Sequence, residues 1–227
     1  FNNITGAKQH VGNYAGVTVE KKEGYKKFDG HELLFIDLPG TYSLTARSLD
    51  ELVARNVIVN DNPDVIVNVL DASNLERNLY LAAQLLELEK PMVIALNMSD
   101  VAEDMGIKYD LKKMAEMTGA TIVSTVGRTN IGTKELLEAT VSVAASQKAP
   151  GVTINYGDLL EGKISELVEL LKQAGTVTYP LRWIAVKLLE KDADVIGKVM
   201  RFDNTEAVIQ KAEAIREEIK NQVDLDV

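Results

Sequence analysis

Two short polar motifs in the sequence combine residue types that can bind a nucleotide. Asp37-Leu38-Pro39-Gly40 follows an apolar run and places a carboxylate three residues before a glycine whose N–H could approach a phosphate closely. Asn97-Met98-Ser99-Asp100 follows another apolar run and places an amide and a carboxylate three residues apart. Guanine presents N1–H and N2–H₂ donors on one edge, so the Asp100 carboxylate could accept from both, whereas adenine would leave it unpaired. The two motifs therefore favour GTP over ATP.

Each motif alone is a weak signal, because Asp-x-x-Gly is often a turn and Asn-x-x-Asp is often a helix cap. Their order and their positions directly after apolar runs make the combination much more specific. Together they reproduce the layout of a GTPase G domain.

Four short apolar runs supply the strands that such motifs require. The runs are continuous rather than alternating, as expected of parallel strands buried on both faces. They are residues 33–36, 65–70, 92–96 and 121–126. Helical patterns separate the runs, and one of them begins with the capping-box pattern Ser48-Leu49-Asp50-Glu51. The sequence therefore predicts an α/β fold, an open and mostly parallel sheet with helices on both faces.

The pattern changes near Lys148, where Ala149-Pro150-Gly151 interrupts the chain. Downstream of this point the sequence shows amphipathic helices without clear buried strands. We therefore predict two domains: residues 1–148 with the α/β fold, and residues 149–227 forming a small all-α unit.

Composition excludes several classes of function. With 25 Lys plus Arg against 34 Asp plus Glu, the net charge is −9, the wrong sign for binding nucleic acid. No apolar stretch approaches the roughly 20 residues that cross a membrane, so this part of the chain is expected to be soluble. The chain has no Cys, and its two His, His10 and His31, are far apart, so no Fe²⁺ site is expected in it.

Three longer segments closely resemble the cytosolic GTPase domain of the bacterial ferrous iron transport protein B (FeoB) family. These segments are residues 11–24, 37–44 and 71–81. Residues 181–183 and 187–190 resemble that family's helical domain, which is linked with slowing GDP release. The resemblance implies a P-loop-GTPase-like fold and a GDP-dissociation-inhibitor-like helical domain. It also implies the GTP-binding, GTP-hydrolysing switch domain of a Fe²⁺ transporter, at the cytoplasmic face of the bacterial inner membrane.

The resemblance also implies roles for individual residues. Thr18 matches the switch I threonine that binds Mg²⁺ and senses the γ-phosphate, Asp37 would hold Mg²⁺ through water, and Gly40 would give its N–H to the γ-phosphate. Thr18 and Gly40 are therefore the expected catalytic residues, whereas Thr41 stands where Ras-like enzymes have a water-orienting Gln. Met98 replaces a common Lys, and its unbranched stem can still cover the base. The expected GTP-binding residues are Gly16, Val17, Thr18, Val19, Glu20, Asp37, Leu38, Pro39, Gly40, Asn97, Met98, Ser99, Asp100, Val126, Gly127 and Arg128.

The implied ligands and partners are GTP or GDP, Mg²⁺, and K⁺, since many members of the family are potassium-activated. The implied protein partners are the C-terminal membrane domain of the same protein and a second copy in a homo-oligomer. Residues 41–48 would form switch II. Lys21-Lys22 and Lys26-Lys27 are expected to lie on exposed faces of a hairpin-like region and not to bind nucleic acid. Arg77 is expected to be a solvated residue in the first turn of a helix, without a catalytic role.

A P-loop, Gly-x-x-x-x-Gly-Lys-Ser/Thr, occurs nowhere in these 227 residues. We expect roughly 15 to 20 further residues upstream of Phe1, enough for a short strand and the motif, and little nucleotide affinity without them. Two other functions stay open at this stage. One is a soluble translation- or tRNA-modification-type GTPase, and the other is an interaction module that kept the fold without binding nucleotide.

Overall fold

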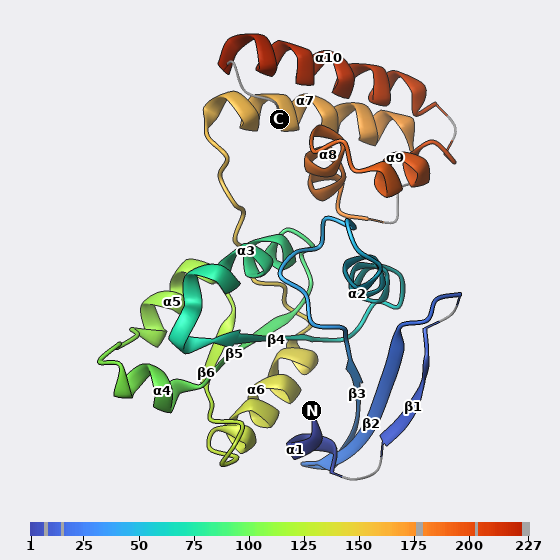
Figure 1. Ribbon diagram of the computed structural model, residues 1–227. Helices are drawn as coiled ribbons and strands as arrows, with labels where there is room; N and C mark the ends of the chain where they lie inside the picture. The colour runs from blue at the N-terminus through green and yellow to red at the C-terminus, as the bar shows by residue number, and fades with distance from the viewer. Residues whose placement is uncertain (7–8, 15, 176–178, 203, 224–227) are drawn as a thin grey trace. The chain divides into compact units, whose positions relative to one another are not determined.

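The chain forms two compact units, Phe1–Val152 and Thr153–Val227, each of which is described by itself. The computed structural model (Figure 1) describes residues 1–6, 9–14, 16–175, 179–202 and 204–223. Within these residues the first unit contains strands and helices, and the second contains helices. The predicted class, an α/β fold followed by helices, is confirmed.

The strands of the first unit form two three-stranded sheets, in the orders β1-β2-β3 and β4-β5-β6. The elements in chain order are α1 (Asn2–Thr5), β1 (Gln9–Asn13), β2 (Glu20–Phe28), β3 (His31–Asp37), α2 (Leu49–Asn60), β4 (Ile66–Asp71), the 3₁₀ turn η1 (Ala72–Asn74), α3 (Leu75–Leu86), β5 (Met92–Asn97), α4 (Ser99–Asp104), α5 (Leu111–Thr118), β6 (Thr121–Ser124) and α6 (Thr133–Ser146).

The sheet β4-β5-β6 is parallel, as the apolar runs predicted. Its register places Asp71 opposite Asn97 and Leu96 opposite Ser124, so the carboxyl ends of the three strands meet at one edge. Strand β5 is buried from Met92 to Leu96 because helices cover both faces of the sheet. Helix α6 packs on one face, and α3 and α5 lie on the other side (Figure 1). This edge positions the polar residues that follow β5 and β6.

The sheet β1-β2-β3 differs from the expectation of parallel pairing, because β3 pairs antiparallel with β2. The turn between them is Asp29-Gly30, and both residues have positive φ, 48° and 78°. Such a two-residue turn fits the right-handed twist of a hairpin and brings Phe28 opposite His31. The apolar run 33–36 therefore lies in a hairpin whose last residue, Asp37, begins the Asp-x-x-Gly motif.

The second unit consists of α7 (Asp158–Ala174), α8 (Leu181–Leu189), α9 (Ala193–Val199) and α10 (Glu206–Val223). Helices α7, α8 and α10 pack on one another, and α9 packs on α8. Their shared core contains Ile164, Leu167, Leu171, Trp183, Ile184, Leu188, Val195, Val199, Val208, Ala212, Ile215 and Ile219. None of the described helices has both the length and the apolar character that crossing a membrane requires.

Candidate functional site

A cavity of about 650 Å³ opens beside the end of β3. Residues of the β1–β2 connection, of the Asp-x-x-Gly motif and of the first turn of α2 line it. They are Thr18, Val19, Glu20, Lys22, Asp37, Leu38, Pro39, Gly40, Leu49 and Asp50. The fold thus brings Thr18 into the same cavity as Asp37 and Gly40, although these residues are about 20 positions apart in the chain.

The connection between β1 and β2 presents Thr18 to this cavity. The Tyr14 N–H donates to the Val19 carbonyl over 3.0 Å, which closes the connection into a compact turn. Val17 and Val19 pack inward against the core cluster around Tyr14, and Thr18 between them is exposed. Gly16 and Val17, both predicted to bind GTP, are not among the residues that line the cavity.

Asp37 is held at the end of β3 by a buried tyrosine. The Tyr14 hydroxyl donates to the Asp37 carbonyl oxygen over 3.0 Å. Burial, with further contributions from the charges of Asp37, Glu23 and Asp61, raises the pKa of Tyr14 to about 12. Tyr14 therefore stays a neutral hydrogen-bond donor at physiological pH and fixes the backbone that carries the Asp37 carboxylate.

Lys22 also lines the cavity, although the sequence pattern assigned it to an exposed face of the hairpin. It stands directly opposite Asp37 in the β2–β3 register, so the two side chains share one face of the sheet. Its ammonium group lies 3.5 Å from Glu20, another lining residue. With Asp50 the lining carries three carboxylates and one ammonium, an excess of negative charge that favours a bound cation.

The loop that follows the Asp-x-x-Gly motif is fastened by the Glu51 carboxylate. It accepts hydrogen bonds from the Ser43 hydroxyl at 2.5 Å, the Arg47 N–H at 2.8 Å and the Ser48 N–H at 3.3 Å, and from the Thr45 hydroxyl at 3.4 Å. The Ser48 hydroxyl in turn accepts from the Glu51 N–H, so the predicted capping box is confirmed. One side chain thus organises most of the segment 43–48.

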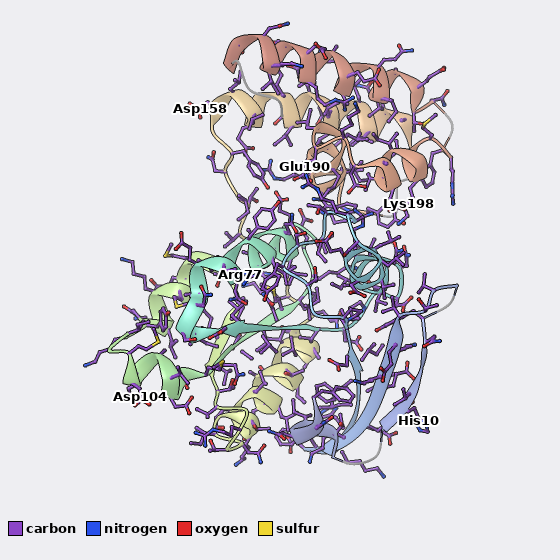
Figure 2. All side chains as sticks on the ribbon, viewed as in Figure 1. His10, Arg77, Asp104, Asp158, Glu190 and Lys198 are labelled. Carbon is purple, nitrogen blue, oxygen red and sulfur yellow. The ribbon has the colours of Figure 1, made fainter. Side chains whose placement is uncertain are left out.

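Helices α2 and α3 hold the same loop at two further points. The buried Leu44 donates its N–H to Gln84 Oε1 over 2.5 Å, and its carbonyl accepts from Arg55 over 3.4 Å. Arg77 of α3, labelled in Figure 2, lies 3.9 Å from the centre of the Tyr42 ring. Arg77 is exposed, as expected, but it also forms a cation–π contact with the loop.

Replacing Glu51 with Gln is expected to destabilise the first unit by roughly 1 kcal/mol at pH 7, because the neutral amide oxygen accepts hydrogen bonds more weakly than the carboxylate. Partial burial raises the pKa of Glu51, but hydrogen bonds from Ser43, Arg47, Ser48 and Thr45 outweigh burial and lower it below its ordinary 4.5. The charged form thus adds stability that is full above pH 4.5 and is lost as the pH falls through the lowered pKa. Denaturant unfolding from pH 7 to pH 3 measures whether the difference between wild type and variant shrinks.

Glu76→Gln is the matched control for this prediction, because Glu76 is an exposed carboxylate in the first turn of α3. It removes the same charge near a helix N-terminus, and we expect it to cost only a few tenths of a kcal/mol. Equal effects of the two variants at pH 7 would contradict the role given to Glu51.

A second group of predicted residues assembles at the carboxyl edge of the parallel sheet. Asn97 Oδ1 accepts from the Gly127 N–H at 2.9 Å and from the Thr125 hydroxyl at 3.3 Å. The Ser99 N–H and hydroxyl both donate to the Thr125 carbonyl. A Cβ at Gly127 would lie 3.3 Å from Asn97 Oδ1, so glycine suits this close approach. Asn97 and Ser99 thereby join the Asn-x-x-Asp motif to the loop after β6.

Three side chains of this group differ in their surroundings. Met98 is 39% exposed and adopts a left-handed conformation, φ 59°, at the start of α4. The Asp100 carboxylate lies 3.3 Å from the Arg128 guanidinium. Val126 is buried and bridges to Ile131, so its side chain belongs to the core rather than to an open site. Within the described ranges, no three His, Asp or Glu side chains come together as a metal site.

Comparison with known families identifies both units of the chain. Residues 1–140 match the family described as ferrous iron transport protein B, and residues 156–227 match the family described as the FeoB cytosolic helical domain. A Porphyromonas gingivalis Fe(2+) transport protein A/FeoB fusion protein is 44% identical over 86% of this chain, and Staphylococcus aureus Fe(2+) transporter FeoB is 38% identical over 99%. The chain spans only 24% and 33% of the length of these two relatives.

Solved structures agree in both sequence and fold. The cytosolic domain of the T. maritima FeoB iron transporter in its GMPPNP form is 31% identical, with a TM-score of 0.85 over 98% of this chain and 92% of that one. A GDP-bound variant of the S. thermophilus FeoB G-domain is 36% identical, with a TM-score of 0.90 over 100% of this chain and 85% of that one. The resemblance predicted from the sequence is confirmed.

Proposed function

The chain belongs to the ferrous iron transport protein B family, and on this premise we propose that it binds and hydrolyses GTP as the cytosolic switch of a Fe²⁺ transporter. The observation that carries the proposal is the assembly of the guanine-reading motif and its supporting loop at one edge of the parallel sheet. The cavity around Thr18, Asp37 and Gly40 supports the same proposal, as the place where the phosphates of the nucleotide would bind.

The Asp100 carboxylate would recognise guanine by accepting from N1–H and N2–H₂ of the base. Asn97 supports this recognition indirectly, because its carboxamide oxygen holds the Gly127 N–H and fixes the loop beside the base. The Gly127 N–H is therefore engaged within the protein, and a base oxygen would share it or take a neighbouring N–H. Met98, which is partly exposed beside Asp100, would cover one face of the base.

Thr18 and Asp37 would hold Mg²⁺ at the phosphate end. They fit this ion, because both offer hard oxygen atoms in a cavity with excess negative charge, and Mg²⁺ usually takes one or two protein ligands and keeps several waters. When bound there, Mg²⁺ would supply positive charge that offsets the negative charge developing on the transferred phosphoryl group. Gly40 lines the same cavity, and its N–H would donate to the γ-phosphate.

The residue after Gly40 does not replace the water-orienting Gln of Ras-like enzymes. The Thr41 hydroxyl donates to the Ser43 carbonyl over 2.6 Å and accepts from the Ser43 N–H. Both hydrogen bonds stabilise the turn in which Thr41 itself lies. We infer that the backbone of residues 38–41 positions the attacking water. Potassium activation stays a prediction, which hydrolysis assays with KCl in place of NaCl would measure.

In the whole protein, GTP binding and hydrolysis would signal to a membrane domain through which Fe²⁺ passes. We place the chain at the cytoplasmic face of the bacterial inner membrane, with the second unit slowing GDP release. A homo-oligomer stays a prediction. These roles rest on relatives of which the chain spans about a quarter to a third.

Calorimetric titration with GDP and with ATP in Mg²⁺ buffer tests the proposed function. The protein should be expressed from its full reading frame. We expect GDP to bind and ATP to give no measurable heat, because the Asp100 carboxylate rejects the adenine edge. Equal binding of both nucleotides, or binding of neither, would overturn the proposal.

A further inference from the structure

The carboxylate that would read guanine already has a partner in the protein. The Arg128 Nη2 atom lies 3.3 Å from Asp100 Oδ2. The Asp100 side chain is 35% exposed and that of Arg128 is 81% exposed, so solvent reaches both groups. The pair is open to an incoming ligand, and the arginine side chain has room to move away.

The backbone that carries Arg128 is fixed on several sides. The preceding residue, Gly127, donates its N–H to Asn97 and accepts at its carbonyl from the Asn3 amide. Val126 bonds to Ile131 across the base of the loop. Loop movement is therefore not needed to make or break the ion pair, because rotation of the Arg128 side chain is enough.

The chemistry of the pair resembles that of the proposed ligand. A guanidinium presents N–H donors side by side in one plane to a carboxylate, and the N1–H and N2–H₂ edge of guanine does the same. Both groups would use Asp100 Oδ2, which the Arg128 guanidinium contacts in this structure. They therefore compete.

We propose that Arg128 is a gate on the base-binding carboxylate, held by Asp100 in the nucleotide-free protein and displaced when the guanine base enters. This proposal rests on the proposed function, since it assigns a competitor to the same site. Exposed ion pairs favour the paired state by only about two- to five-fold. Only about one third to one sixth of the molecules then present an unpaired Asp100, so the gate slows guanine association about three- to six-fold and does not block it.

Stopped-flow binding of a fluorescent GDP analogue tests the gate, again in the protein from its full reading frame. We expect Arg128→Gln to raise the association rate constant about three- to six-fold, and Arg128→Lys to give a smaller increase. The difference in association rate constant between wild type and Arg128→Gln should become smaller when the salt concentration is raised about tenfold, because salt weakens an exposed ion pair.

Lys134→Gln is the matched control. Lys134 also forms an exposed ion pair, 3.6 Å from Glu138 in α6, and its replacement changes the net charge equally. We expect the association rate constant to stay at the wild-type value. An equal increase in both variants would show a general charge effect and overturn the gate.

Two further outcomes separate the gate from the proposed function. If all variants bind the analogue with the same rate constants, or if Arg128→Gln only speeds dissociation, guanine binding stands and the gate fails. If neither wild type nor variants bind it, the proposed function fails and the gate with it. Nuclear magnetic resonance of the nucleotide-free protein checks the pair directly, because the Arg128 Nε–H signal should shift in Asp100→Asn.

Discussion

Replacing Asp100 with Asn is expected to change the preferred base from guanine to xanthine. An Asn amide has one acceptor oxygen and no charge, so one hydrogen bond to the base is lost and the other loses its charge assistance. The lost bond is worth about 1.5 to 3 kcal/mol, and the weakened bond and the amide N–H₂ that now faces the base N–H₂ add to this, so GDP affinity should fall about 100-fold. Xanthine carries an oxygen in place of the amino group, and the Asn amide N–H₂ can donate to it. Calorimetry with GDP and with xanthosine diphosphate measures both effects.

Asp104→Asn controls for the change in charge. Asp104, labelled in Figure 2, is an exposed carboxylate at the end of the same short helix α4. Its replacement should leave both affinities within about twofold of wild type, as is usual for exposed positions. Unchanged GDP affinity in Asp100→Asn would remove the basis for assigning guanine recognition to this motif.

Replacing Asp37 with Asn is expected to lower the rate of GTP hydrolysis about 100-fold or more, since stabilising charge in the transition state is worth several kcal/mol. The amide keeps the size of the side chain and its place opposite Lys22, but it removes a negative charge from the cavity. The requirement for Mg²⁺ should rise at the same time. Single-turnover hydrolysis across a range of Mg²⁺ concentrations measures both.

The control for this variant is Asp50→Asn. Asp50 lines the same cavity from the first turn of α2, but no role in holding the ion is assigned to it. We expect a loss of less than about tenfold, the part that comes from the field of the cavity alone. If Asp50→Asn loses as much activity as Asp37→Asn, the overall charge of the cavity matters and not the specific carboxylate.

The sequence could predict features that depend on local pattern. The continuous apolar run 92–96 predicted a fully buried strand, and Ser48 with Glu51 predicted a capping box, because neighbouring residues alone determine both. The antiparallel pairing of β3 with β2 was missed, although a hairpin-like region was expected around Lys21-Lys22, because an apolar run does not determine which strand it pairs with. Its signal was Asp29-Gly30, a typical turn pair.

Features that join distant residues could not be predicted. The hydrogen bond from Leu44 to Gln84 links positions 40 residues apart, and the pair of Asp100 and Arg128 links positions 28 apart. Both depend on how α3 and the loop after β6 dock on the sheet, which neither periodicity nor motif spacing encodes. Lys22 was read as a surface residue because its cross-strand partner was unknown.

The left-handed backbone at Met98 limits which mutations this protein can accept during evolution. A φ of 59° costs L-residues roughly 1 kcal/mol, and β-branched side chains pay the most. The backbone conformation therefore limits which residues can stand at position 98, independently of any contact with a ligand. Unbranched residues, asparagine and glycine can adopt this conformation at low cost. The larger cost of valine, isoleucine or threonine would have to be offset by stabilising changes elsewhere. Substitutions among relatives at the position of Met98 should follow these conformational limits.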